Sequence, residues 1–386
     1  MPSLPRPPTS LLAVACGIIV ANLYYAQPLV ALIGADLDLA PDLRGLVTTL
    51  TQLGYGLGLI LLVPLADLLE NRNLAVGILV AGTLALVGAA VAPVAWVFLP
   101  MVFFVGLGSV TVQVLVPYAS HFAPEADRGK VVGQVMGGLL AGILLARPAA
   151  SFLAQATSWR VVFLTSAAIM VVVGVILYLA LPRRVPPQRP RYRDLLQSIA
   201  TLIRTQPLLR RKAFHHACLF AAFSLFWTTV PLKLSAMGLD QSAIGWFALA
   251  GVAGAVAAPL AGRWTRGIGG ASILVRLVVA VGFLLALLGN TLSWPIVILL
   301  LAAIIIDFGV SAHLVFAQRQ IFGLGTAIRG RINGVFMATF FVGGALGSAS
   351  GVWLYAHGGW VPAAAVGAGL ALLSLAFPEK SVAAEA

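Results

Sequence analysis

Long apolar runs separated by short polar breaks cover almost the whole chain. A membrane-spanning helix needs about 20 mainly apolar residues, and the length of the chain suits about twelve such spans. The runs of the first half are Ser10–Ile33, Gly45–Leu65, Leu74–Val91, Ala95–Ser120, Val131–Ala154 and Val161–Leu181. Those of the second half are Ala213–Leu234, Ser242–Ala261, Ala271–Leu287, Ser293–Ala317, Ile332–Tyr355 and Val361–Leu375. Lipid-exposed irregular backbone is excluded inside a bilayer, so the pattern predicts an all-α membrane protein with twelve transmembrane helices.

The most polar stretch lies in the middle of the chain, from Pro182 to Lys212. It holds Arg183, Arg184, Arg189, Arg191, Arg193, Arg204, Arg210, Arg211 and Lys212, together with five prolines. We interpret it as a solvated linker between two membrane-embedded halves. The predicted organisation is a six-helix bundle over 1–181, a cytoplasmic linker over 182–212 and a second six-helix bundle over 213–386. Within the linker, Leu195 to Ile203 could form a short amphipathic helix on the membrane surface.

The two halves resemble each other at a nearly constant offset. Arg329-Gly330-Arg331 follows Arg128-Gly129-Lys130 by 201 positions, and the same shift takes Gly142 to Gly343 and Trp159 to Trp360. Several such pairs over several spans indicate a duplicated unit. Parallel six-helix repeats place the substrate site near the middle of the bilayer, between the halves.

Composition and charge agree with a membrane location and exclude other classes. The chain is 60% hydrophobic and 9% charged, with a mean hydropathy of +1.01, whereas soluble domains carry about 25% charged residues. The net charge of +12 does not indicate nucleic-acid binding, because the basic residues fall mainly in loops that face one side, as the positive-inside rule expects. We therefore expect a monomeric, multi-pass protein of a bacterial inner membrane with both termini in the cytoplasm. Cys16 and Cys218 lie within apolar runs, which gives no disulfide framework.

The chain resembles the major facilitator superfamily of transporters over nearly its whole length. The segment PLADLLENRN after the second run is similar to the signature loop of that family, with Asp67 and Arg72 in matching places and Leu68 and Glu70 in place of an arginine and a glycine. The fifth run, GGLLAGILLARPAASFL, resembles the Gly-Pro-rich span of the drug/proton antiporter branch, with Arg147-Pro148 where Gly-Pro is usual. The resemblance implies two pseudo-symmetric six-helix bundles and alternating access.

Two charged side chains are expected at membrane depth, where a charge costs free energy and usually has a functional role or a partner. Asp307 is the only acidic residue in the middle of a run, and Arg147 is expected to be the only basic residue well inside one. Burial favours the neutral form of a carboxyl, which suits reversible protonation or binding of a cationic group. Arg147 is a counter-charge for Asp307, a clamp for an anionic substrate, or an arginine that reaches the outer headgroups. His313 is a candidate second proton site or a packing histidine.

Polar and aromatic side chains in other runs could line a substrate cavity. In the first span of each repeat, which lines the cavity in the superfamily, a shift of 203 relates Tyr24 and Tyr25 to Trp227 and Thr228. The resemblance therefore implies a partly aromatic pocket, although helix packing or interfacial belts would also explain these residues. The candidate substrate-binding residues are Asn22, Tyr24, Tyr25, Gln27, Gln52, Gln113 and Trp227.

Asp67, Arg72 and Arg128 are interpreted as a gate. An aspartate at a cytoplasmic helix end can hold the N-terminus of a facing helix, or an arginine such as Arg128, and so stabilise the outward-open state. A plain solvated loop is the alternative.

The function that follows is secondary active transport, by proton-coupled efflux of a small, partly hydrophobic molecule. No nucleotide loop, metal-spaced set or nucleophile–His–acid set is visible in the sequence, so we expect no enzyme, no cofactor and no metal. The expected partners are a small-molecule substrate, protons and the lipid bilayer. A facilitator or proton symporter of a polar solute such as a sugar or amino acid is the alternative, and a non-transporting receptor is less favoured.

Overall fold

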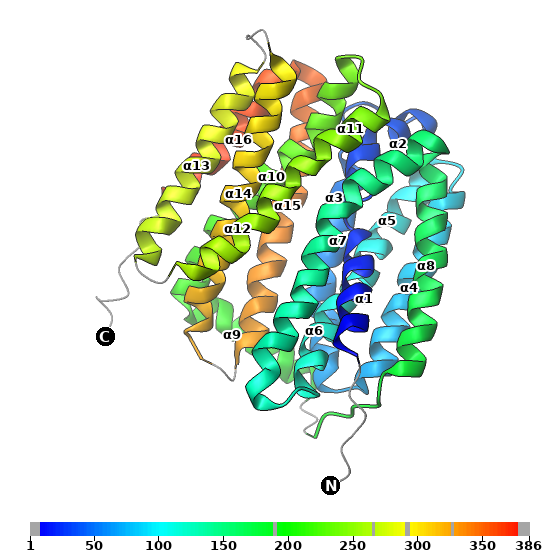
Figure 1. Cartoon of the computed structure of the whole chain (residues 1–386), viewed down its shortest axis with the longest axis vertical. Helices are drawn as coiled ribbons and strands as arrows, with labels where there is room; N and C mark the ends of the chain where they lie inside the picture. The colour runs from blue at the N-terminus through cyan, green and yellow to red at the C-terminus, as the bar shows by residue number, and fades with distance from the viewer. Residues whose placement is uncertain (1–7, 188–190, 265–266, 290–293, 326–327, 377–386) are drawn as a thin grey trace.

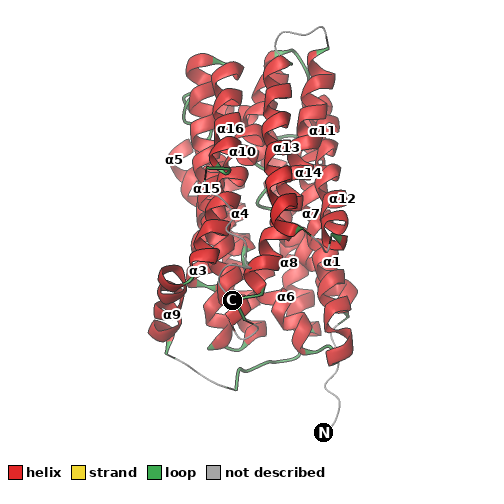
Figure 2. Ribbon diagram, turned by 90° about the vertical axis from the view of Figure 1, so that its left-hand side faces the viewer, coloured by secondary structure: helices red, strands yellow, loops and turns green. Residues whose placement is uncertain are grey.

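Two helical bundles stand side by side in the computed structural model, which describes residues 8–187, 191–264, 267–289, 294–325 and 328–376 (Figure 1). All regular secondary structure in these ranges is helical, as Figure 2 shows. The first bundle is built from α1 (Thr9–Ala21), η1 (Gln27–Leu29), α2 (Val30–Asp36), α3 (Leu46–Leu61), η2 (Val63–Asp67), α4 (Asn71–Val91), α5 (Ala95–Ser109), α6 (Thr111–His121), η3 (Glu125–Asp127), α7 (Arg128–Ala156) and α8 (Trp159–Ala180).

The second bundle follows after α9 (Tyr192–Thr205). It consists of α10 (Pro207–Ala236), α11 (Gln241–Ala248), η4 (Leu249–Gly251), α12 (Val252–Arg263), α13 (Ile268–Leu288), α14 (Pro295–Phe322), α15 (Arg329–Gly358) and α16 (Trp360–Leu373). Ten helices of the described residues are long and apolar enough to cross a membrane, and the shorter apolar helices Thr9–Ala21 and Trp360–Leu373 bring the set to the predicted twelve. The predicted fold class is therefore confirmed.

Two boundaries differ from the sequence expectation. The first apolar run is not one continuous helix, because the chain leaves α1 at Asn22 and resumes through η1, in which Pro28 has no backbone N–H to donate. At the other boundary, α10 begins at Pro207 and takes Arg210, Arg211 and Lys212 into its first turns. These three residues therefore lie in the same helix as the apolar run that begins at Ala213.

Glycines set a close helix contact in the first bundle, between α1 and α7. A Cβ atom on Gly138 would lie 2.2 Å from the carbonyl oxygen of Ala13, and one on Gly142 would lie 2.0 Å from that of Gly17. Real Cβ atoms do not approach an oxygen so closely, so only glycine fits at these two positions. The small-residue spacing of four thus lets the two backbones touch.

The second bundle repeats this contact between α10 and α15. A Cβ atom on Gly343 would lie 2.5 Å from the carbonyl oxygen of Ala217, and one on Gly347 would lie 2.0 Å from that of Ala221. Since Gly343 follows Gly142 by 201 positions, the internal repeat of the sequence corresponds to equivalent helix pairs in the two bundles.

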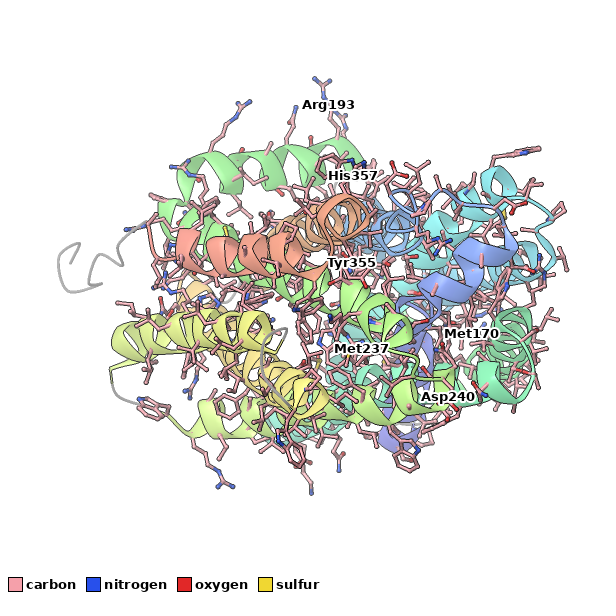
Figure 3. The ribbon with its side chains drawn as sticks, turned by 90° about the horizontal axis from the view of Figure 1, so that it is seen from above. Met170, Arg193, Met237, Asp240, Tyr355 and His357 are labelled. Carbon is pink, nitrogen blue, oxygen red and sulfur yellow. The ribbon has the colours of Figure 1, made fainter. Side chains whose placement is uncertain are left out.

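The amphipathic helix α9 lies outside the bundles, at the end of the molecule where α1 begins (Figures 1 and 2). Leu195, Ile199 and Leu202 form its buried face, and α9 contacts α10, α15 and η2. Tyr192 donates a hydrogen bond of 2.8 Å to the carbonyl oxygen of Leu61. Arg193 points away from the bundles (Figure 3). We call this end of the molecule, with α9, Arg184 and Arg331, the basic end.

At the opposite end the two bundles are in contact. Gln241 at the start of α11 donates hydrogen bonds of 2.9 Å to the carbonyl oxygen of Pro28 and 3.1 Å to Oγ of Ser151. On the first bundle, Arg160 forms a salt bridge and hydrogen bond with Asp36. That hydrogen bond holds the pKa of the Asp36 carboxyl below its ordinary value. Between the bundles, α11 packs against α7 and α10 packs against α2, so the passage is closed at this end.

The orientation in the membrane follows from the positive-inside rule and can be tested by labelling. In a background without the buried Cys16 and Cys218, we expect Ala236→Cys to react with an impermeant maleimide in intact cells. Arg193→Cys should react only after the membrane is made permeable. Ala236 ends α10 and Arg193 lies on α9, and both are exposed. The reverse pattern of labelling would place the basic end outside the cell.

Candidate substrate cavity

A cavity of about 400 Å³ lies between the two bundles. Helices of both bundles line it, and its polar and aromatic wall includes Tyr24, Tyr55, Gln113, Arg147, His216, Phe220, Phe223, Asp307 and Phe341. A second volume of about 750 Å³ adjoins it at the basic end, and the two share Gln113 and Asn333. The central cavity therefore communicates with the basic end of the molecule and is closed at the opposite end.

Arg147 is positioned by α7 and buried at 2% exposure. Its Nε donates a hydrogen bond of 2.8 Å to Oε1 of Gln27. Its guanidinium carbon lies 5.0, 5.4 and 4.5 Å from the ring centres of Tyr24, Phe223 and Trp227. Tyr24 and Trp227 are the pair that the internal repeat relates, so equivalent rings of both bundles hold this arginine through cation–π contacts.

Asp307 reaches the same region from α14 and is 5% exposed. Its Oδ2 accepts a hydrogen bond of 2.7 Å from Nε1 of Trp227. Trp227 therefore contacts both charged side chains, through its ring face toward Arg147 and through its N–H toward Asp307. Sequence reasoning identified all three residues, but their convergence on one point is a property of the tertiary structure.

The polar residues expected in the cavity divide into two groups. Gln113 lines the cavity and donates a hydrogen bond of 2.9 Å to the hydroxyl of Tyr55, which also lines the cavity. Gln52 instead bridges the bundles near the cavity, where its Nε2 lies 2.7 Å from Oγ of Ser224. Direct contact with a cavity ligand is thus available to Gln113 in this conformation, while Gln52 acts between α3 and α10.

Asn22 and Tyr25 face the neighbouring helix α8. Oδ1 of Asn22 accepts a hydrogen bond of 2.5 Å from Ser166, and its Nδ2 lies 3.5 Å from Sδ of Met170. Tyr25 interacts with the same Ser166. Neither residue is among those that line the central cavity. In this conformation both instead hold the segment that follows α1 against α8.

His313 lies behind the cavity wall and not beside Asp307. Its Nδ1 is 3.1 Å from Nδ1 of His216, and the two rings are stacked at 5.3 Å with 10° between their planes. His216 itself borders the cavity. One ring must donate and the other accept for this contact to be a hydrogen bond, so the pair has a position for one shared proton. If His313 takes part in proton coupling, as proposed from the sequence, it would do so together with His216.

One expectation about charges is wrong. Arg147 is not the only basic residue inside a span, because Arg276 of α13 is buried at 1% exposure. Its Nη1 donates a hydrogen bond of 2.6 Å to the carbonyl oxygen of Ser374 and lies 3.4 Å from Nδ1 of His215. The sequence signal was present, since Arg276 interrupts the apolar run Ala271–Leu287. Arg276 is satisfied within the second bundle and does not line the central cavity.

The three predicted gate residues occupy different surroundings. Asp67 lines the volume at the basic end, and Arg128 is exposed at the start of α7. No salt bridge joins them among the described residues. Arg72 instead donates long hydrogen bonds of 3.3 and 3.4 Å to the carbonyl oxygens of Tyr178 and Leu181, at the end of α8. The gate remains a prediction for the state in which the basic end is closed.

Replacement of Asp67 tests that prediction. We expect Asp67→Ala to lower the transport rate severalfold and to leave ligand affinity within about twofold, because Asp67 lies outside the central cavity and would act by biasing the conformational equilibrium. Transport in proteoliposomes and binding to purified protein are the two measurements. A parallel loss of both would contradict a gating role, and Asp194→Ala on the exposed side of α9 serves as the control.

Comparison with known proteins places this architecture among transporters. The sequence profile of the Major Facilitator Superfamily matches residues 12–325. YgaY of Escherichia coli (strain K12), which is named as a transporter, is 36% identical over 381 residues, which cover 95% of this chain and 93% of that protein. SCO4007 of Streptomyces coelicolor (strain ATCC BAA-471 / A3(2) / M145), also named as a transporter, is 32% identical over 358 residues, which cover 91% of this chain and 82% of that protein.

Solved structures share the fold at low sequence identity. The nucleoside transporter NupG, solved as a point mutant, superposes with a TM-score of 0.74 at 16% identity, over 95% of this chain and 98% of that one. A D-xylose-proton symporter superposes with a TM-score of 0.72 at 16% identity, over 96% and 97% of the two chains. These similarities concern the arrangement of the helices and not the ligand.

Proposed function

This chain belongs to the major facilitator superfamily, and on that premise we propose that it is a proton-coupled exporter of a small, partly hydrophobic molecule. The substrate binds in the cavity between the bundles, and Asp307 is the group that exchanges protons. In this proposal the cavity alternates between the basic end, which lies in the cytoplasm, and the opposite end. The drug/proton antiporter branch is the part of the superfamily that this mechanism matches.

The observation that carries the proposal is that the Asp307 carboxyl is buried without a salt bridge among the described residues. It is buried at membrane depth, one oxygen is held by Trp227, and the cavity reaches its side chain. No salt bridge of Asp307 occurs among the described residues, and an ionised carboxylate in such surroundings is costly unless a partner binds it. A proton or a cationic group of the substrate can supply that partner, and the two would compete for one oxygen.

Competition at one carboxylate is sufficient for exchange transport. When the cavity is open to the cytoplasm, the substrate displaces the proton, and after the cavity opens on the other side a proton displaces the substrate. In each state the negative charge of Asp307 is neutralised, either by the proton or by the cationic group of the substrate. This lowers the free energy of the closed intermediate through which the bundles pass as they change orientation. Arg147, which is fixed by three aromatic rings, keeps its charge in both states.

Inside-out membrane vesicles that contain the protein can test this exchange. Their lumen is acidified by respiration, and candidate compounds are added from outside, on the face that corresponds to the cytoplasm. We expect a transported compound to dissipate the pH gradient in vesicles with the wild-type protein and to leave it intact with Asp307→Asn. If compounds that bind the purified protein never move protons in this assay, the proton-coupled export is wrong.

A proton symporter of a polar solute is the second candidate. Amide groups on the cavity wall, such as those of Gln113 and Asn333, favour it because they can hydrogen-bond to a polar solute. The same vesicles separate the two mechanisms. A symporter dissipates the gradient only when the solute is loaded into the acidic lumen, whereas an antiporter responds to solute added outside.

A further inference from the structure

Arg147 and Asp307 are two halves of a charge pair that is left open in this structure. No N–O contact within salt-bridge distance joins them among the described residues. Both nevertheless face one point on η4, because a Cβ atom on Gly251 would lie 3.6 Å from Nη1 of Arg147 and 3.7 Å from Oδ1 of Asp307. Both atoms thus lie at contact distance from a position where the chain has no side chain.

Neither charge is fully compensated by the protein. Nη2 of Arg147 is buried without a hydrogen-bond partner among the described residues, and the aromatic rings around the guanidinium offer π faces in place of acceptors. For Asp307 the only bond found within the described part of the chain is the one from Trp227 to Oδ2. A buried polar group without its partner costs free energy, and a charged one costs more. The site therefore has unused capacity for one anionic and one cationic group.

We infer that the cavity binds a small amphipathic zwitterion, whose carboxylate contacts Arg147 and whose ammonium contacts Oδ1 of Asp307. This inference rests on the proposed function only in taking the cavity as the substrate site. The apolar part of the ligand lies against the aromatic wall formed by Phe220, Phe223 and Phe341, which borders the same cavity. A cavity of about 400 Å³ falls within the ordinary range for small-ligand sites.

A zwitterion fits this arrangement better than a ligand with a single charge. An anion satisfies Arg147 but leaves Asp307 to take up a proton, and a cation at Asp307 leaves Nη2 of Arg147 without an acceptor among the described residues. A zwitterion completes both halves and adds no net charge to the cavity. The two hydrogen bonds to charged groups are of the short, strong kind, at about 2.8 Å each. The missing side chain at Gly251, next to both groups, leaves room for ligand atoms that contact them.

Matched ligands that differ only in their charges can test this. The protein purified in detergent is heated with L-tryptophan, with tryptamine, which lacks the carboxylate, and with indole-3-propionate, which lacks the ammonium. L-leucine, isoamylamine and 4-methylpentanoate form a second set. Ligands that bind the folded state raise the unfolding temperature. We expect at least one zwitterion to bind at least about tenfold more tightly than both of its single-charge analogues, since each lost bond to a charge weakens binding by about that factor or more.

Variants assign the two ends of the ligand. Arg147→Gln should weaken the zwitterion and the acid alike, whereas Asp307→Asn should weaken the zwitterion and spare the acid. Gly251→Ala retains both charges and makes only ordinary contacts, but it places a methyl group against both side chains, where ligand atoms that contact both would lie, so it should weaken the zwitterion selectively. It also keeps the test decisive if Arg147→Gln does not fold. Arg193→Gln, on the outer side of α9 (Figure 3), is the control that removes a charge elsewhere.

The inference is overturned if no zwitterion of either set binds, or if zwitterions and their single-charge analogues bind equally. Unchanged zwitterion binding in Gly251→Ala would also overturn it, because the ligand would then not occupy the space next to both side chains. These outcomes are distinct from failure of the proposed export. A zwitterion that binds as expected but moves no protons in inside-out vesicles supports the binding site and contradicts the coupling.

Discussion

Asp307→Asn is expected to abolish accumulation of substrate against its gradient and to leave exchange down the gradient in place. The asparagine side chain keeps the shape of the carboxyl and can still accept the hydrogen bond from Trp227, but it can neither bind nor release a proton. The coupling of substrate movement to proton movement is thereby lost, while the rocking of the bundles is retained. In proteoliposomes with an imposed pH gradient, accumulation should fall to the level of liposomes without protein.

The control for this experiment is Asp194→Asn, which removes an exposed carboxylate on α9. If Asp307→Asn still accumulates substrate at the wild-type level and with the wild-type pH dependence, Asp307 is not the coupling group. The pair of His216 and His313, of which His216 borders the same cavity, is then the next site to replace. Unchanged transport with alanine at Asp307 and His313 together would favour a facilitator.

Gly138→Ala and Gly137→Ala are expected to change stability in opposite directions, although the two glycines are neighbours in α7. A Cβ atom on Gly138 would lie 2.2 Å from the carbonyl oxygen of Ala13, whereas a Cβ atom on Gly137 would meet no atom within 4 Å. Overpacking of a close helix contact costs about 1–3 kcal/mol. The exposed position should instead gain up to about 1 kcal/mol, because alanine loses less conformational freedom in a helix than glycine.

Thermal unfolding of the two variants in the same detergent measures this difference directly. Gly347→Ala provides an independent check in the second bundle, since its Cβ atom would lie 2.0 Å from the carbonyl oxygen of Ala221. Equal stability of Gly138→Ala and Gly137→Ala would mean that α1 and α7 can separate without cost. The contact would then be a sliding surface and not a fixed joint of the first bundle.

The position of Arg147 links the two bundles of the transporter. It belongs to α7 of the first bundle, yet two of the rings around it, Phe223 and Trp227, belong to α10 of the second. Gln27 and Tyr24, from the first bundle, hold its other sides. A movement of one bundle against the other must therefore change the surroundings of this guanidinium, which gives a physical route from ligand contact at Arg147 to the conformational equilibrium.

The sequence by itself determined the architecture and the identity of the main charged residues. Apolar runs of spanning length allow only helices inside a bilayer, so the twelve spans could be read from their hydropathy. The constant offset between the halves gave the duplication, which the glycine contacts of α1 with α7 and of α10 with α15 reproduce. Asp307 and Arg147 were visible because a charge inside an apolar run is rare and costly.

Only the tertiary structure decided which side chains meet. Periodicity along one helix gives the face that a residue occupies, but not the helix that covers that face. The convergence of Arg147, Trp227 and Asp307 from α7, α10 and α14, the pairing of His313 with His216, and the turn of Asn22 toward Ser166 therefore could not be predicted. The same limit explains Arg276, whose apolar run was recognised while its partner near the end of α16, the carbonyl oxygen of Ser374, was not. Contacts between spans depend on how the helices pack in three dimensions, and that information is not contained in the pattern of any single span.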